Sequence, residues 1–219
     1  MAFPPTGRQV YLADGGALMD SAAYGVQAAD FSVGRVPDGT GQWVLNSPTP
    51  AALNSPAGLG SLAALSINEW MADPASGADW FEVFNSGASP VAIAGCSFTD
   101  ALTEKTLSPV PPLSFVGIGA DAFAPFQADG DYSAGADHVN FKLGKGGEAI
   151  GLFSPSGSLV TAVSFGVQST GVSQGRLPDG STNIVGFLGS PTAGESNFLP
   201  LPSVVVNEVL SHTEPPFEN

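Results

Sequence analysis

Hydrophobic residues in the middle of the chain fall into short runs separated by clusters of Gly, Pro and Ser. Residues 80–84 illustrate the pattern, because Phe81 and Val83 alternate with the polar Glu82, as expected for a strand with one buried face. The strands predicted in this way are 65–71, 80–84, 91–98, 113–118, 139–143, 148–153 and 159–165, with two shorter ones near Val172 and Ile184. Many short strands at this spacing predict an all-β fold of the β-sandwich type, with almost no helix.

Part of this pattern occurs twice. Residues 24–39 read YGVQAADFSVGRVPDG, and residues 165–180 read FGVQSTGVSQGRLPDG, with nine of sixteen positions identical at an offset of 141. The likeness continues downstream, where the segments SPT at 47–49 and SPT at 190–192 are each followed by an Asn. A repeat of this kind indicates a structural unit that is used more than once.

A second pair of segments defines the other end of the unit. Residues 66–69, SINE, resemble residues 205–208, VVNE, at an offset of 139. The repeat length is therefore about 140 residues. Three parts are predicted: 1–54 as the C-terminal part of a preceding unit, 64–197 as a complete unit, and 203–219 as the opening strand of a following unit.

Composition and charge narrow the function classes. The net charge is −14, with only six Lys and Arg residues, so the clustered positive charge that binds nucleic acid is missing. The chain has no apolar run of 18 residues and one cysteine, Cys96, so membrane insertion and an intrachain disulfide are not expected. The N-terminus lacks the features of a signal peptide, and we expect Met1 to begin a fragment of a longer exported parent.

An acidic loop is the best candidate for a cation site. Asp129, Asp131 and Asp137 fall within nine residues, and their spacing partly matches an acidic calcium loop. The match is incomplete, because Ala134 and Asn140 stand where such loops carry Gly and Glu. Calcium binding and a simply solvated loop are the two interpretations.

Arg and Asp around the repeated Pro-Asp-Gly turn form a second candidate. Arg176 with Asp179 recurs as Arg35 with Asp38. An Arg beside such a turn can clamp a carboxylate or a carbonyl, either to recognise a ligand or to brace the fold. Because the pair is repeated, the structural brace is the favoured interpretation.

The polar residues within predicted strands pose a similar choice. Asn68, Glu69 and Glu82 could form a ligand or cation cluster, or they could satisfy backbone groups at turns and edges. The latter is favoured, because buried polar groups without partners are rare. The two histidines, His138 and His212, lie in different units, so no His-based metal site and no Ser-His-Asp triad is expected.

Several of these segments, in order, resemble the lamin-tail domain family. The motifs are INE at 67–69, DWFEVFN at 79–85, PVAIAG at 90–95, FKLGKGGE at 141–148, and GRLPDG followed by SPTAG at 175–194. Cys96 departs from the aromatic residue that the family often has at that position. The resemblance implies an immunoglobulin-like sandwich, and bacterial members are accessory modules of large exported proteins, some attached to nucleases or phosphatases.

Three functions are compatible with these observations. The first is a non-catalytic structural or interaction module, extracellular or at the cell surface, that spaces or presents other domains. The second is a carbohydrate- or calcium-binding module, suggested by Trp80, Phe84, Tyr132 and the acidic loop. The third is an accessory domain of an exported hydrolase. No enzyme activity of the chain itself is expected, and the partner would be an unidentified protein or glycan.

The two partial units are also expected to seek partners. Left alone, residues 1–54 would expose strand edges and apolar side chains, including Tyr11, Leu12, Tyr24 and Phe31. The strand 204–210 could add to the partial unit of a neighbouring chain, as adjoining repeats of the parent would do. Docking of the N-terminal part onto the complete unit of its own chain is the alternative, and association between chains is favoured.

Overall fold

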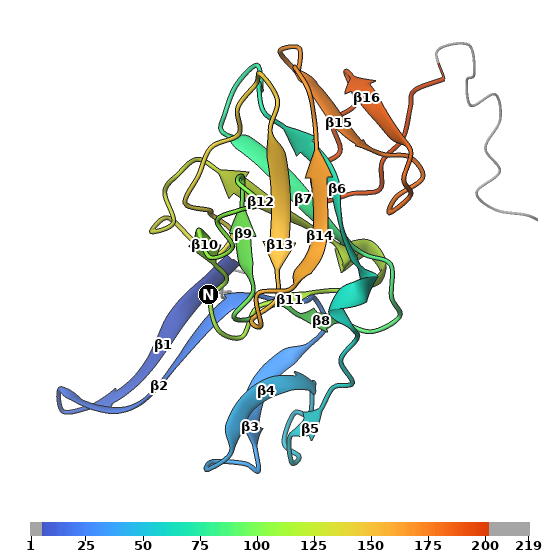
Figure 1. The fold of residues 1–219 in the computed structure, drawn as a ribbon. Helices are drawn as coiled ribbons and strands as arrows, with labels where there is room; N and C mark the ends of the chain where they lie inside the picture. Colours follow the sequence, from blue (N-terminus) through green and yellow to red (C-terminus); the bar gives the residue numbers. More distant parts are fainter. Residues whose placement is uncertain (1–5, 202–219) are drawn as a thin grey trace, which may run out of the picture.

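The structure is a computed structural model that describes residues 6–201. Within this range it contains β-strands and two short 3-10 turns, η1 (Leu62–Ala64) and η2 (Gly119–Ala122), but no α-helix. Strands β6 to β16 form a compact sandwich, and strands β1 to β5 project from one end of it (Figure 1). The all-β, immunoglobulin-like prediction is thus confirmed for the described part of the chain.

Two antiparallel sheets make up the sandwich. The larger has the strand order β12-β7-β6-β15-β16, and the smaller has the order β10-β9-β13-β14. A two-stranded pair, β11-β8, closes one end. The strands are β6 (Leu65–Met71), β7 (Asp79–Asn85), β8 (Val91–Ala92), β9 (Ser97–Thr99), β10 (Ser108–Pro109), β11 (Phe115–Val116), β12 (Phe123–Ala128), β13 (Ala149–Phe153), β14 (Leu159–Ser164), β15 (Val172–Arg176) and β16 (Ile184–Leu188).

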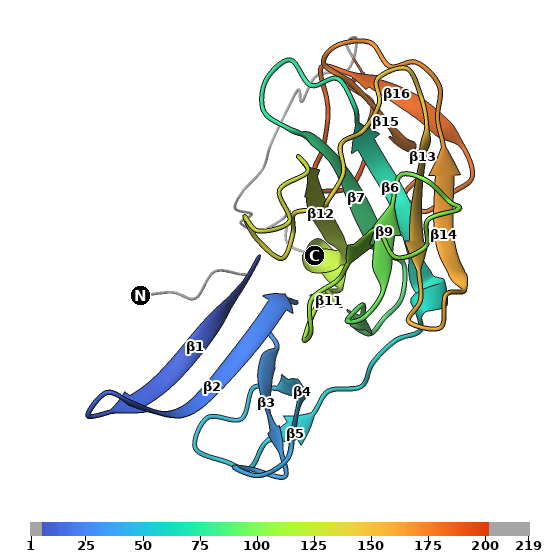
Figure 2. The ribbon, with the colours of Figure 1, turned by 60° about the vertical axis from the view of Figure 1, so that its left-hand side comes forward.

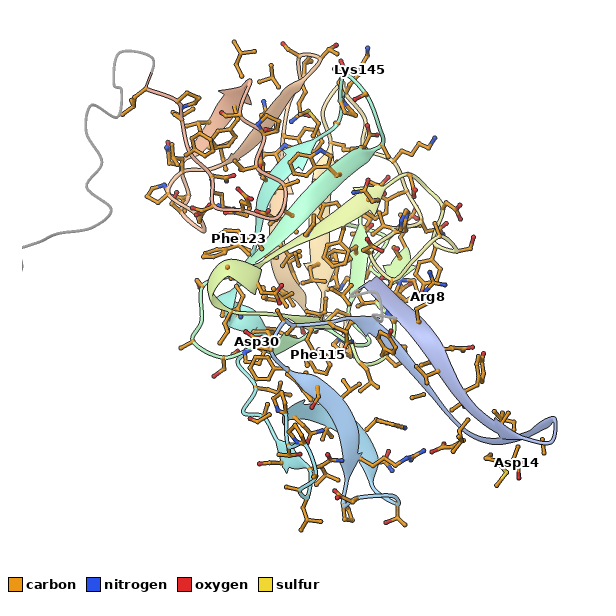
Figure 3. The ribbon with its side chains drawn as sticks, turned by 180° about the vertical axis from the view of Figure 1, so that it is seen from behind. Arg8, Asp14, Asp30, Phe115, Phe123 and Lys145 are labelled. Carbon is orange, nitrogen blue, oxygen red and sulfur yellow. The ribbon has the colours of Figure 1, made fainter. Side chains whose placement is uncertain are left out.

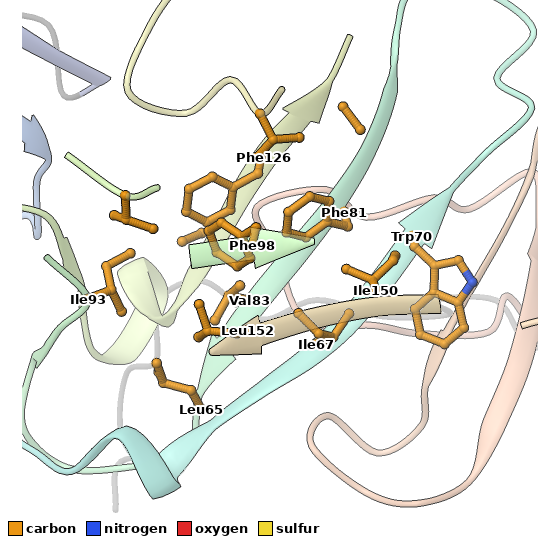
Figure 4. Packing of buried hydrophobic residues seen from close by; sticks show 14 of the residues in the cluster. Leu65, Ile67, Trp70, Phe81, Val83, Ile93, Phe98, Phe126, Ile150 and Leu152 are labelled. Atoms are coloured by element: carbon orange, nitrogen blue, oxygen red, sulfur yellow. The ribbon is translucent and has the colours of Figure 1, made fainter. Parts of the chain in front are cut away.

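Aromatic side chains fill the space between the sheets (Figure 4). The ring of Phe81 packs edge-on against Phe98, with centroids 5.0 Å apart, and it stacks on Phe126 at 5.5 Å. All three rings are almost completely buried. Burial of a large aromatic side chain contributes about 1.5–3 kcal/mol, so this cluster is a main source of the stability of the sandwich.

The N-terminal part forms two small sheets. Strands β1 (Thr6–Asp14) and β2 (Ala17–Val26) make a long hairpin that points away from the sandwich (Figure 2). Strands β3 (Ser32–Val36), β4 (Gln42–Ser47) and β5 (Ser55–Pro56) pair in the order β3-β4-β5. By sequence offset, β1–β2 correspond to β13–β14, and β3–β4 correspond to β15–β16, so the second half of a unit is repeated here.

A small apolar cluster holds the N-terminal part against the sandwich. Phe115 of β11 packs with Ala28 and Leu45, and all three are buried. Figure 3 shows Phe115 where the sandwich meets the N-terminal sheets. The backbone N–H of Gly25 donates to the carbonyl of Leu113 at 3.3 Å. The half-unit therefore docks on the complete unit of its own chain, which was the less favoured of the two expectations.

This docking leaves much of the hairpin uncovered. Tyr11 and Leu12 are 60% and 64% exposed, as expected for a half-unit. Tyr24 and Phe31 are half-buried, and Phe31 packs against the small cluster, so the expected exposure was wrong for these two. The segment 203–219 lies outside the described residues.

Most predicted strands are present, but β10 and β12 of the sandwich were not predicted. β12 contains Pro125, which cannot donate a ladder hydrogen bond. Because β12 is an edge strand, Pro125 is tolerated there. The opposite error occurred at 139–143, where Val139, Phe141 and Leu143 are buried as predicted but the backbone forms only isolated bridges.

Two other predicted strands are shorter than expected. The 91–98 run is divided between β8 and β9, because the chain turns at Gly95, whose φ of +74° suits glycine. The 113–118 run contributes only β11. None of the helices in the described range could span a membrane.

Candidate functional site

A buried polar network links the first two strands of the large sheet to the last part of the unit. Its centre is Asn68 on β6, whose Nδ2 lies 3.0 Å from Glu82 Oε1 and 3.0 Å from Asp179 Oδ1. The N–H of Gly180 donates to Asn68 Oδ1 at 2.9 Å. The Asn68 side chain thus joins Glu82 of β7 to the Pro-Asp-Gly turn, whose Asp179 is 111 residues from Asn68 in the sequence.

Glu82 is bound from a further segment. The N–H of Gly194 donates to its Oε2 at 2.7 Å. Glu82 is fully buried, and burial, as the largest cause, raises its pKa to about 8. The nearby carboxylates of Glu69 and Asp179 add to this rise, whereas the hydrogen bonds from Asn68 and Gly194 oppose it. Burial therefore favours the protonated form of Glu82.

Glu69 lies beside this centre and is also fully buried. Ser173 Oγ donates to Glu69 Oε1 at 2.5 Å, and Thr192 Oγ1 lies 2.8 Å from Glu69 Oε2. Burial raises the pKa of Glu69, against hydrogen bonds from Ser173 and Thr192 that lower it. This carboxyl group is thus held within the protein by the two hydroxyls.

The proton count around Thr192 also favours a neutral Glu69. Thr192 Oγ1 is within hydrogen-bond distance of two acceptors, Glu69 Oε2 at 2.8 Å and Asn197 Oδ1 at 2.7 Å, yet a hydroxyl has one proton to donate. The Asn197 amide orientation is fixed, because its Nδ2 donates to the Arg176 carbonyl at 2.9 Å. If Glu69 carries a proton, it can donate to Thr192, which then donates to Asn197, and every group is satisfied.

Arg176 and Asp179 also link the last part of the unit to the rest of the sandwich. Arg176 Nε donates to the Ile67 carbonyl at 2.7 Å, and its Nη1 donates to the Ser181 carbonyl at 2.5 Å. Asp179 accepts from the N–H of Asn197 at 3.0 Å and from the hydroxyl of Ser196. Their partners are strand and turn groups of this unit.

The N-terminal half-unit contains the corresponding brace. The N–H of Asn54 donates to Asp38 Oδ1 at 3.0 Å, and Asn54 Nδ2 donates to the Arg35 carbonyl at 3.0 Å. Arg35 Nη1 donates to the Gly41 carbonyl at 3.3 Å, and its Nη2 forms an ion pair with Asp20 at 3.0 Å. Arg35 and Asp38 therefore occupy the places of Arg176 and Asp179, without the strand that Asn68 belongs to.

The structure does not bring the acidic loop together as a cation site. Asp129 Oδ2 pairs with His138 Nδ1 at 2.7 Å, and its Oδ1 accepts from the N–H of Asp131 at 2.9 Å. Asp131 Oδ1 accepts from the N–H and hydroxyl of Ser133. Among the described residues no group of three or more His, Cys, Asp or Glu side chains could hold a metal ion, so Asp129, Asp131 and Asp137 are not gathered around one point.

Other candidate groups are buried or covered. Cys96 is buried, which raises its thiol pKa to about 11 and leaves it unreactive. The ring of Phe84 is stacked on that of Phe123 at 4.7 Å, so one face is not available to a sugar. Trp80 lines a shallow hollow with Pro191 and Phe198.

Three members of the network were not singled out from the sequence as site residues: Ser173, Thr192 and Asn197. A signal for them was present, because each recurs in the half-unit as Ser32, Thr49 and Asn54. A small polar residue that is repeated at a fixed offset within otherwise different sequence indicates a shared structural contact. The sequence pattern could not show that all three contact the same two strands.

Comparison with known proteins supports the identification of the sandwich. Residues 61–166 match the family model of the Lamin Tail Domain, a family of immunoglobulin-like interaction modules. The match ends before β15, so the segment that closes the polar network lies beyond it. No curated protein and no solved structure matches the chain.

Proposed function

Because residues 61–166 match the family model of the Lamin Tail Domain, we propose that this chain is a non-catalytic structural and interaction module of a large exported protein. In this proposal, successive immunoglobulin-like units space or present the other domains of the parent. The site of action is extracellular or at the cell surface.

The observation that carries the proposal is the brace that occurs twice in one chain. Asn197 and Asn54 each bind an Asp carboxylate and an Arg carbonyl through the same atoms, at distances of 2.9–3.0 Å. A ligand-binding site would not need its side chains to face the protein's own backbone in both copies. A unit built to be repeated needs such a contact in each copy.

The polar residues of the network hold the parts of the unit together. Glu69 and Glu82 are fully buried, so a substrate in solution has no access to either carboxyl group. Besides Asn68 of β6, their hydrogen-bond partners are Ser173, Thr192 and Gly194, which belong to the closing segment of the unit. This arrangement supports a structural role for the network.

The connection between units supports a spacing role. Residues 50–64 contain Pro, Gly, Ser and Ala and join the half-unit to the sandwich with a single short strand, β5. A net charge of −14 favours solubility and disfavours anionic surfaces. Both features suit a series of units that hold neighbouring domains apart.

An activity assay with matched variants tests the proposal. The full chain is incubated with phosphomonoester, phosphodiester and glycoside substrates, alongside Glu69→Gln, Glu82→Gln and the exposed control Glu104→Gln. We expect no turnover above buffer for any of the four proteins. Turnover that either buried-site variant abolishes, while its circular dichroism spectrum stays that of the wild type, would overturn the proposal.

A further inference from the structure

Strand β3 has a free edge in the described structure. It pairs with β4 on one side, and no described strand pairs with it on the other. In the complete unit the corresponding strand, β15, is flanked by both β16 and β6. We propose that the free edge of β3 binds residues 203–210 of a second copy of this chain as an added antiparallel strand.

The sandwich shows what such a strand supplies. β6 pairs with β15 so that Glu69 lies opposite Gly175 and Trp70 lies opposite Gln174. It also brings Asn68 to the Pro-Asp-Gly turn and Glu69 to the hydroxyls of Ser173 and Thr192. The strand therefore adds both a backbone ladder and two polar side chains.

The half-unit retains the groups that would receive these side chains. Asp38 is the counterpart of Asp179, and Ser32 and Thr49 are the counterparts of Ser173 and Thr192. Ser173 and Thr192 are buried, whereas Ser32 and Thr49 are half-buried and make no side-chain hydrogen bond within the described residues. The receiving hydroxyls are present but lack the carboxyl group that joins them in the complete unit.

Asn46 marks the same position independently. Its side chain is fully buried, and its Oδ1 has no hydrogen-bond partner among the described residues. A Cβ atom added to Gly34 would lie 2.9 Å from Asn46 Nδ2, whereas one added to Gly175 would lie 2.6 Å from the carbonyl oxygen of Asn68. Asn46 Nδ2 already donates to the carbonyls of Gly34, at 3.3 Å, and Val44, at 3.0 Å, so Oδ1 is the atom of this amide that is left to accept a hydrogen bond.

The proposed occupant matches β6 in sequence. Residues 205–208, VVNE, align with residues 66–69, SINE, at an offset of 139. By this alignment, Asn207 would bind Asp38 as Asn68 binds Asp179. Glu208 would bind the hydroxyls of Ser32 and Thr49 as Glu69 binds those of Ser173 and Thr192. By the same register, Glu208 would lie opposite Gly34, and Val209 opposite Val33.

A second copy, rather than the chain itself, supplies the strand. Val204 follows Leu201 by three residues, which extend to about 10 Å at most. The described chain ends beside β15 and β16, at the opposite end of the molecule from β3 (Figure 1). Strand donation from one copy to the next is open-ended, so it predicts chains of molecules that lengthen with concentration.

One contact of β6 would not be reproduced. Gln168 binds the end of β6, through the Trp70 carbonyl at 3.2 Å and the Ala72 N–H at 2.5 Å. Its counterpart, Gln27, instead donates to the Leu113 carbonyl at 2.6 Å, where the half-unit docks on the sandwich. The added strand is therefore expected to be held mainly by the brace and the backbone ladder.

Sedimentation of the full chain, with two proline variants, tests the inference, which rests on the proposed interaction role. Val206→Pro places a residue without an N–H within the added strand, and Thr213→Pro is the matched control beyond it. We expect the wild type and Thr213→Pro to associate with increasing concentration, and Val206→Pro to stay monomeric. Asn207→Ala should raise the dissociation constant by about tenfold or more, because Asp38 loses its side-chain partner.

Register is tested by disulfide trapping. A Val33→Cys chain and a Val209→Cys chain, purified separately and mixed under oxidising conditions, should form a linked pair, whereas Val33→Cys with Thr213→Cys should not. A monomeric wild type at all concentrations, or association that Val206→Pro leaves unchanged, would overturn strand addition. Either result would leave the non-catalytic role intact, since the activity assay tests that role separately.

Discussion

Asn68 and Glu82 are hydrogen-bonded side chains on adjacent strands, with Asn68 Nδ2 3.0 Å from Glu82 Oε1 and both residues fully buried. The pair places the carboxyl group of Glu82 in the protein interior, where burial disfavours its charged form. The stability of the unit should therefore depend on pH through Glu82.

The sign of this dependence follows from the raised pKa of Glu82, which is about 8 in the folded protein against 4.5 for an ordinary Glu. Between these values the folded state binds a proton that the unfolded state has released. The free energy of unfolding should thus fall as pH rises from 5 to 8, by on the order of 1 kcal/mol per pH unit. Glu69, whose pKa is also raised, acts in the same direction.

Urea denaturation at several pH values checks this. In the Glu82→Gln variant the free energy of unfolding should depend less steeply on pH. The absolute stability of this variant also changes, because an amide group replaces the carboxyl group. The exposed control Glu104→Gln should keep the wild-type slope. Parallel slopes for all three proteins would contradict a buried, protonated Glu82.

The two braces should differ in strength. Asp179 accepts hydrogen bonds from Asn68, Asn197 and Ser196, whereas Asp38 accepts from the N–H of Asn54 and is exposed. Asp179→Ala is expected to cost about 2–4 kcal/mol of unfolding free energy, because it leaves buried donors without a partner. Asp38→Ala should cost less and act locally.

Hydrogen exchange separates these effects. Asp179→Ala should increase exchange across β6 and β15, and Asp38→Ala should increase it only in β3 and β4. Equal destabilisation of the whole molecule by both variants would show that the two braces are not independent.

The sequence predicted the sandwich well, because its signals are local or repeated. Alternation within 80–84 located β7, which spans Asp79–Asn85. The sequence could not locate β12, where Pro125 is acceptable only because no strand lies beyond it. An edge position depends on the three-dimensional strand order, which periodicity along the chain does not contain.

The partners of the network were hidden for a similar reason. Asn68 contacts Asp179 across 111 residues of sequence, and Glu69 contacts Thr192 across 123. Such separations are set by the pairing of β6 with β15, which the sequence does not state. In the acidic loop, Asp129, Asp131 and Asp137 are close in sequence and suggested a cation site. Among the described residues, however, no group of three or more His, Cys, Asp or Glu side chains could hold a metal ion.

Calcium should leave the melting temperature unchanged. Asp129 is already paired with His138, and its pKa is lowered by hydrogen bonds from Asp131 and His138, which outweigh the opposing effect of burial. Thermal melts with and without millimolar calcium check this expectation. A rise in melting temperature that Asp131→Ala removes would instead establish the calcium site considered from the sequence.

Thr192 offers the sharpest test of the proton arrangement. Its hydroxyl lies between Glu69 and Asn197, and it can serve both only if Glu69 is protonated. Thr192→Val keeps the shape of the side chain but removes the hydroxyl, so the two neighbours lose a partner each. The expected cost is about 2–3 kcal/mol of unfolding free energy. Thr192→Ser retains the hydroxyl and should cost less than about 1 kcal/mol, from the lost methyl group.

Infrared spectroscopy then identifies the proton directly. The wild type at neutral pH should show the carbonyl stretch of a neutral carboxylic acid, and Glu69→Gln should remove part of it, while Glu104→Gln should not. In Thr192→Val the band of Glu69 should shift, since its hydrogen-bond partner is gone. A spectrum without a neutral-acid band at neutral pH, together with equal costs for Thr192→Val and Thr192→Ser, would mean that Glu69 is ionised and that the hydroxyl of Thr192 donates to it.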